Sequence, residues 1–118
     1  VLKKKEDDKN ELYAIVEFSP EPKGGYTGFK IRNQRNLKYP LKAQKNKVEG
    51  YVFVDCIVEK DGNLSNIKLR KGIGYGCDEE AIRLVKMSSP WNPGRVKGVP
   101  VRVQKTIAIK FKLKNKNK

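Results

Sequence analysis

Residues 50–70 decide the fold, with G-Y-V-F-V-D-C-I-V at 50–58, E-K-D-G-N at 59–63 and L-S-N-I-K-L-R at 64–70. The first run has apolar residues at every second position, which is the period of a strand. Tyr51, Phe53 and Ile57 lie on its other side, so we expect a central strand covered largely on both faces. Asp61-Gly62 supplies the positive φ angles of a tight turn. The stretch therefore predicts an antiparallel hairpin.

After the hairpin the sequence predicts a helix. Asp78 is expected to cap this helix by accepting hydrogen bonds from free backbone amides at its start. Pro90 ends it, and Trp91 is expected to anchor the helix end onto the core. Pro93-Gly94 then predicts a turn.

Residues 101–113 form the last predicted element. Apolar and polar side chains alternate along them, and Lys105 is the only polar residue on the apolar side. This pattern predicts a long strand with one buried face. Its lysines discourage indiscriminate pairing, yet its backbone remains available to an added strand.

The segments before the hairpin predict a further strand and two helices. Residues 12–18 are β-prone and predict an extra strand or an extended segment. Tyr26, Phe29 and Ile31 begin a weak apolar stripe of a helix at 26–36, and Pro40 suits the first position of a second, short helix. The predicted fold class is α+β, with a three-stranded antiparallel sheet packed against two helices and an extra strand at the N-terminal side.

Composition bounds the function. The chain has 118 residues, which is the size of one domain, and a formal net charge of +14. It has no histidine and two cysteines, so hydrolase triads and zinc sites are excluded, and we expect no catalytic residue, metal or cofactor. The charge block at 3–9 is typical of the end of a linker. We therefore expect a linker end at 1–11, a domain at 12–113 and a basic tail at 114–118.

Two small-residue features have alternative interpretations. Gly72, Gly74 and Gly76 precede a helix, as in a phosphate-binding loop, but their spacing fits no nucleotide motif, so a strand-to-helix connection is favoured. Cys56 and Cys77 each occupy apolar positions and are either buried free thiols or, in an oxidising compartment, a disulfide.

A set of short motifs in register resembles the TonB C-terminal domain family, in particular its Bacteroidetes branch. The similarity covers about 22–113, with departures at Cys56, where the family has a large apolar residue, and Cys77, where leucine is common. The motifs are Tyr39-Pro40-x-x-Ala43, Gly50-x-Val52-x-Val54, Asp61-Gly62, Glu80-Ala81, Trp91-x-Pro93-Gly94, Gly98-x-Pro100-Val101 and Ile109-x-Phe111.

The resemblance implies a periplasmic domain of an energy transducer, anchored to the inner membrane by a segment absent from this chain and associated there with ExbB and ExbD. It implies that the last strand captures the Ton box of an outer-membrane TonB-dependent transporter by strand addition. Peptidoglycan and a second copy of the chain, as a homodimer, are further candidate partners. Nucleic acid is not an expected partner, because the chain lacks the signature of an RNA-recognition strand.

The resemblance also implies the partner-binding residues. The segment that aligns with the family's Gln-Pro motif is included, although this sequence lacks the motif itself. The implied residues are Arg102, Val103, Gln104, Lys105, Thr106, Ile107 and Ala108 on the last strand, with Asn36, Leu37 and Lys38 before the Tyr-Pro pair.

Two other functions stay open. TonB-like domains also end membrane-bound sensors and peptidases, where they act as interaction modules. The net charge of +14 is also compatible with binding a polyanion, either nucleic acid or cell wall, and such binding falls steeply with salt.

Overall fold

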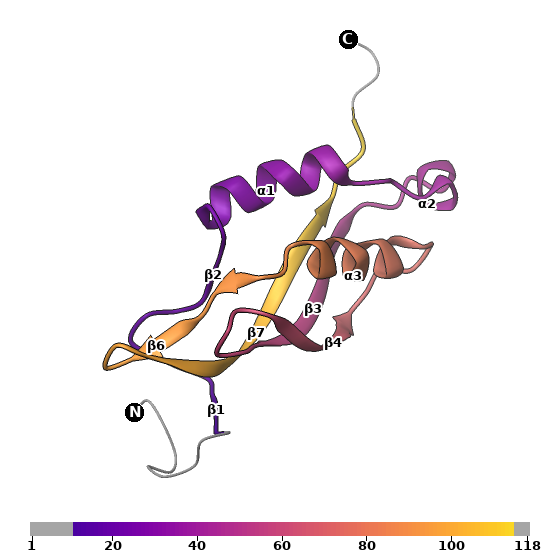
Figure 1. Ribbon diagram of the computed structural model, residues 1–118. Helices are drawn as coiled ribbons and strands as arrows, with labels where there is room; N and C mark the ends of the chain where they lie inside the picture. Colours follow the sequence, from indigo (N-terminus) through magenta and orange to yellow (C-terminus); the bar gives the residue numbers. More distant parts are fainter. Residues whose placement is uncertain (1–10, 115–118) are drawn as a thin grey trace.

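The computed structural model describes residues 11–114 (Figure 1). Within this range no helix is both long enough and apolar enough to cross a membrane. In chain order the elements are β1 (Leu12–Tyr13), β2 (Glu21–Pro22), α1 (Gly25–Asn36), α2 (Leu41–Lys45), β3 (Gly50–Val58), β4 (Leu64–Lys71), α3 (Cys77–Met87), β5 (Trp91–Asn92), β6 (Gly94–Val96) and β7 (Val99–Phe111).

The main sheet has the strand order β1-β7-β3-β4, so the predicted α+β class is confirmed. Its centre is the antiparallel ladder between β3 and β7, which runs without a register shift from Gly50 opposite Phe111 to Val58 opposite Val103. The predicted hairpin joins β3 to β4. The three antiparallel strands are extended by β1 and β6, which both pair with β7, while β2 and β5 form a separate small ladder.

The core lies on the face of the sheet that carries the helices (Figure 1). Trp91 is fully buried there, as predicted, and its Nε1 donates to Ser88 Oγ at 2.9 Å. Its ring makes edge contacts with Tyr26 and Phe29 of α1, at centroid distances of 5.9 and 5.7 Å. The core side chains of the main strands and α3 are Val52, Val54, Cys56, Val58, Ile107, Ile109, Phe111, Cys77, Ala81, Leu84 and Val85.

The expectation that β3 is covered largely on both faces is wrong. Ile57 is buried, but Tyr51 is 50% exposed and Phe53 is only half-buried on the face opposite the core. The residues of α1 and α3 that enter the core all pack on the other face. The alternation at 50–58 therefore predicted the strand correctly, but it did not show which of its two faces other elements cover.

Two predicted boundaries are corrected. Helix α3 begins at Cys77 after Gly76, which has a φ of 87°, and Asp78 does not cap it. Instead the Asp78 carboxylate accepts from the amides of Ile73 (2.8 Å) and Gly74 (3.2 Å), because the glycine loop folds back over it. The chain reversal expected at Pro93-Gly94 lies at 97–98.

That reversal joins β6 to β7 through a two-residue turn. Lys97 and Gly98 have φ angles of 51° and 77°, the positive values that such a hairpin turn requires. Pro93 instead separates β5 from β6. The N-terminal prediction is also shortened, since only Leu12–Tyr13 forms a strand, and Phe18 then pairs with Arg95 of β6 rather than continuing along β7.

Candidate functional site

The backbone of β7 has one side that faces β3 and one that faces away. Two hydrogen bonds in the β3–β4 turn decide which residues face which side: Glu59 N donates to Asn63 O at 2.9 Å and Gly62 N donates to Glu59 O at 2.8 Å. The backbone of Glu59 therefore points toward β4. Because successive residues of a strand point to opposite sides, Val58, Cys56 and Val54 point toward β7.

This alternation continues without a break. Both register shifts in the β3–β4 ladder add residues to β4, and the β3–β7 ladder has none. The residues of β7 opposite Cys56 and Val54, Lys105 and Ile107, therefore direct their amides and carbonyls at β3. Thr106, Ala108 and Lys110 direct theirs away from the sheet. Among the described residues, no strand pairs with β7 on that side beyond residue 103.

The opposite edge of the sheet is less suited to pairing. The edge strand β4 has two register shifts, and Asn66 within it has a φ of 51°. Lys68, Arg70 and Lys71 add exposed positive charge. Bulges and basic side chains are features that natural proteins use to block edge pairing. The outer side of β7 from 104 to 111 is therefore the edge best suited to accept another strand.

A groove of about 450 Å³ runs between α1 and this edge. Helix α1 lies over the far end of β7 in Figure 1 and supplies one wall. Consecutive residues 105–110 supply the other wall, so the groove follows the strand edge itself. Its lining is Tyr26, Phe29, Lys30, Asn33, Gln34, Leu37, Tyr51, Leu84, Lys105, Thr106, Ile107, Ala108, Ile109 and Lys110.

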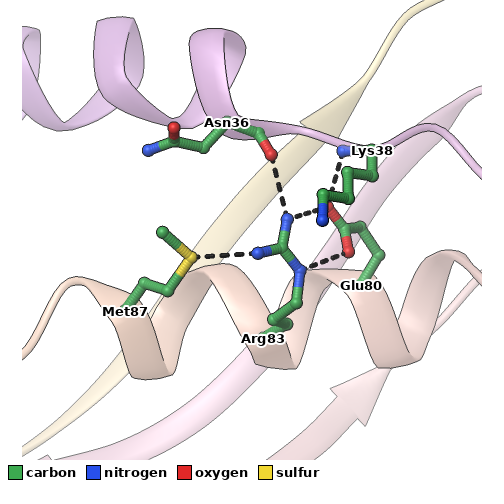
Figure 2. Close-up of polar contacts among 5 residues, drawn as sticks. All are labelled: Asn36, Lys38, Glu80, Arg83 and Met87. Atoms are coloured by element: carbon green, nitrogen blue, oxygen red, sulfur yellow. Dashed lines mark hydrogen bonds and ion pairs between the residues drawn. The ribbon is translucent and has the colours of Figure 1, made fainter.

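The C-terminal end of α1 is tied to α3 by a polar network (Figure 2). Glu80 of α3 is buried and accepts from Arg83 Nε and from the Lys38 amide, both at 2.7 Å. Arg83 Nη2 also donates to the Asn36 carbonyl at 2.9 Å. Burial alone would raise the pKa of Glu80, but the hydrogen bonds from Arg83 and Lys38 outweigh it and lower the pKa. The network holds one end of the groove wall in place.

On the open face of the sheet, hydrogen bonds and ion pairs connect the side chains of neighbouring strands. The Asp55 carboxylate accepts from Thr106 Oγ1 at 2.6 Å and from Arg70 Nη1 at 3.0 Å, and the Thr106 hydrogen bond is the main reason that the pKa of Asp55 is lowered. Arg102 Nε lies 2.8 Å from Glu59 Oε1. These contacts engage side chains and leave the outward backbone of Thr106 accessible.

The structure brings together half of the predicted partner-binding residues. Leu37 of the Asn36–Lys38 segment lines the groove, as do Lys105, Thr106, Ile107 and Ala108. The other predicted residues do not line it. Arg102 and Val103 pair with β1, Gln104 lies at the start of the uncovered edge, and Asn36 and Lys38 bond through their backbones to α3.

Sequence reasoning missed the wall that α1 supplies. Tyr26, Phe29, Lys30 and Asn33 lie at positions i, i+3, i+4 and i+7 of α1, which places them on one helix face. The apolar stripe was expected to include Ile31, but its side chain is 52% exposed. Because this helix face carries both polar and apolar side chains, a search for an apolar stripe does not identify it.

Other chemical candidates do not form a site. Asp78 occupies the position that a phosphate would take in the glycine loop, and its carboxylate lies 2.3 Å from where a Gly72 Cβ would be. Cys56 and Cys77 are buried, unbridged thiols, and burial raises the pKa of Cys56 to about 11. Within 11–114 no group of three His, Cys, Asp or Glu residues is placed to hold a metal ion.

The structure is a small α+β domain. The outer side of its long last strand is an uncovered sheet edge, and a groove runs between that edge and α1. The family model described as Gram-negative bacterial TonB protein C-terminal matches residues 35–113, and the chain belongs to this family. Membership makes it a TonB-type domain, a class of periplasmic, non-catalytic domains of energy transduction. A search of curated proteins finds no match.

Solved structures agree on the fold. A short form of the Helicobacter pylori TonB C-terminal domain, solved by NMR, aligns with a TM-score of 0.60 and 23% identity over 76% of this chain and 95% of that one. A longer form aligns with a TM-score of 0.56 and 22% identity, over 76% and 81% of the two chains.

Proposed function

We propose that this domain captures the Ton box of an outer-membrane TonB-dependent transporter by adding it as a strand to the 104–110 edge of β7. The uncovered edge, bordered by the groove under α1, is the observation that carries the proposal. Strand addition takes its affinity from main-chain hydrogen bonds and its selectivity from alternate side chains. One edge of this kind can therefore engage several transporters.

The position of β7 suits the transmission of force. On its inner side β7 pairs with nine consecutive residues of β3. A pull on a strand captured on its outer side would act along the strand direction. All hydrogen bonds between that strand and β7 would then bear the force together. The captured segment would thus be joined to the centre of the domain and not to a loosely attached element.

The domain organisation follows from the same proposal. We assign residues 1–11 as a linker end and 114–118 as a basic tail around the domain at 12–113; residues 1–10 and 115–118 lie outside the described range. The linker would lead to an anchor in the inner membrane, where ExbB and ExbD convert the proton-motive force into work on the transporter. A TonB-like module of a sensor or peptidase would use the same edge without transport.

An amide NMR titration with Ton box peptides from the same organism, at low and high salt, tests this proposal. We expect shifts concentrated on 104–110 and on the groove face of α1 that persist at high salt. Shifts spread over the lysines that vanish with salt would instead identify a polyanion-binding domain, with peptidoglycan as the first polymer to test. Edge shifts that depend on protein concentration would reveal a homodimer.

A further inference from the structure

The segment that contains α1 and α2 carries a concentration of positive charge. Between Glu21 and Glu49 the chain has eight lysines and arginines and no acidic residue. All eight are exposed. None of them forms an ion pair with a carboxylate in the described part of the chain, where the ion pairs join other residues. The outer surface of these two helices therefore presents positive charge that the domain itself does not neutralise.

Two large apolar side chains are exposed among these cations. Ile31 of α1 is 52% exposed and Leu41 of α2 is 71% exposed. Ile31 lies two positions after the buried Phe29, and Leu41 lies two positions before the buried Ala43. Two positions correspond to roughly 200° around a helix, so both side chains point away from the core. Figure 1 shows α2 beyond the C-terminal end of α1.

Each exposed apolar side chain has a cation beside it on the same helix face. Residues i and i+4 of a helix are neighbours on its surface. Arg35 lies four positions after Ile31, and Lys45 lies four positions after Leu41. Exposed apolar residues next to lysine and arginine are typical of helices that lie on an anionic membrane, where the cations meet lipid headgroups and the apolar side chains enter the acyl boundary.

The aromatic side chains of the same segment point elsewhere. Phe29 is buried, and the ring of Tyr26 makes an edge contact with Trp91. The Tyr39 hydroxyl donates to the Val48 carbonyl. Proteins that bind single-stranded nucleic acid combine positive charge with exposed aromatic rings on which the bases stack. The surface of α1 and α2 combines it with aliphatic side chains, which favours a lipid bilayer as the partner.

We propose that the surface of α1 and α2 around Ile31 and Leu41 binds a bilayer that contains anionic phospholipids. The cations would contact the headgroup phosphates, and the two apolar side chains would enter the boundary between headgroups and acyl chains. Phe29 and Asn33, which line the groove, lie on the opposite side of α1 from Ile31. A domain bound in this way would keep the 104–110 edge of β7 accessible, and the inference does not depend on strand capture.

Vesicle co-sedimentation of the 118-residue chain tests the charge contribution. Phosphatidylcholine vesicles with about 30% phosphatidylglycerol should bind the chain, and vesicles of phosphatidylcholine alone should not. Arg35→Gln combined with Lys45→Gln should weaken binding about 10- to 30-fold. Lys68→Gln combined with Lys71→Gln on β4 makes the same change in net charge and should weaken it less than about 3-fold. Urea unfolding followed by Trp91 fluorescence verifies that each variant is folded.

Ile31→Ser combined with Leu41→Ser keeps the net charge and separates a bilayer from a soluble polyanion. This variant should bind anionic vesicles about 10-fold more weakly or worse, and polyphosphate as the parent does. Vesicle binding unchanged by the two serines would identify a polyanion site and overturn the bilayer proposal. Equal losses in the two lysine and arginine variants would attribute binding to net charge, and no binding to anionic vesicles would also overturn the proposal.

A fluorescent label gives a readout that does not depend on affinity. Cys56 and Cys77 are buried thiols, so a cysteine placed at an exposed position can be labelled selectively. An environment-sensitive dye on Ile31→Cys should shift its emission to shorter wavelength when anionic vesicles are added, because the dye enters an apolar surrounding. The same dye on Lys68→Cys should not shift. Identical responses at the two positions would contradict the orientation of the domain on the bilayer.

Discussion

Replacing Thr106 by proline isolates the backbone contribution to strand capture. The Thr106 amide points away from β3, so its loss leaves the central ladder intact. Proline is tolerated on an edge strand where the missing N–H faces outward. The substitution also removes the hydroxyl that donates to Asp55 at 2.6 Å. Thr106→Val loses the same hydroxyl but keeps the amide, and it is the matched control.

The expected magnitude follows from the ladder. A net hydrogen bond contributes about 0.5–1.5 kcal/mol, and the proline ring would also keep the partner backbone from its neighbouring bond. Losing one to two bonds predicts a decrease in affinity of about 2- to 150-fold. Both variants should lose about 1 kcal/mol or less of unfolding free energy, since the Asp55 contact is exposed. Lys105→Pro, whose amide faces β3, should lose more stability than either.

Binding is measured by anisotropy of a labelled Ton box peptide, and stability by urea unfolding followed through the fluorescence of Trp91, the only tryptophan. The account requires that Thr106→Val binds nearly as the parent does while Thr106→Pro does not. A folded Thr106→Pro variant that binds the peptide with the affinity of the parent would refute the assignment of the Thr106 amide to the 104–110 edge of β7.

Three further predictions concern stability and reactivity. Glu80→Gln should lower the unfolding free energy by about 1–3 kcal/mol at neutral pH; because the folded pKa of Glu80 is lowered, this difference should exist above about pH 4.3 and vanish as the pH falls through the folded pKa. Gly62→Ala should lower the unfolding free energy by more than about 2 kcal/mol, since the new Cβ would lie 1.9 Å from the Trp91 carbonyl oxygen. Gly98→Ala should lower it by only about 1 kcal/mol, the strain of the positive φ, because no neighbouring atom lies within 4 Å of the new Cβ. Urea titrations of the two variants measure the difference. Native Cys56 should resist thiol reagents at neutral pH and react in denaturant, and a lack of reaction in denaturant would show a disulfide with Cys77.

Local patterns predicted the elements that depend on local chemistry. The alternation at 50–58 and 101–113 specifies two strands, and the structure confirms both, the second at Val99–Phe111. The hairpin at Asp61-Gly62 is also confirmed, but only Gly62 has a positive φ, and residues 59–63 form a five-residue connection instead of a tight turn. Asp78 shows where such reasoning fails. An acidic residue at a helix start is a cap only if its side chain turns toward the helix, and here the preceding glycine loop provides closer amides.

The site was predictable in part for the same reason. The sequence predicts the strand that forms the 104–110 edge. Which amides of that strand face outward depends on the hydrogen bonds of Glu59 in the β3–β4 turn. The α1 wall depends on contacts between distant segments, such as Phe29 with Trp91 and Arg83 with the Asn36 carbonyl. No local pattern encodes those pairings.

Residue-resolved amide hydrogen exchange, with and without a bound Ton box peptide, tests the central claim most directly. In the free domain the amides of Lys105, Ile107 and Ile109 should be protected by β3, while those of Thr106, Ala108 and Lys110 exchange rapidly. Binding should add protection at Thr106, Ala108 and Lys110. Saturating peptide that leaves these three amides in rapid exchange would contradict capture of the peptide as a strand on β7.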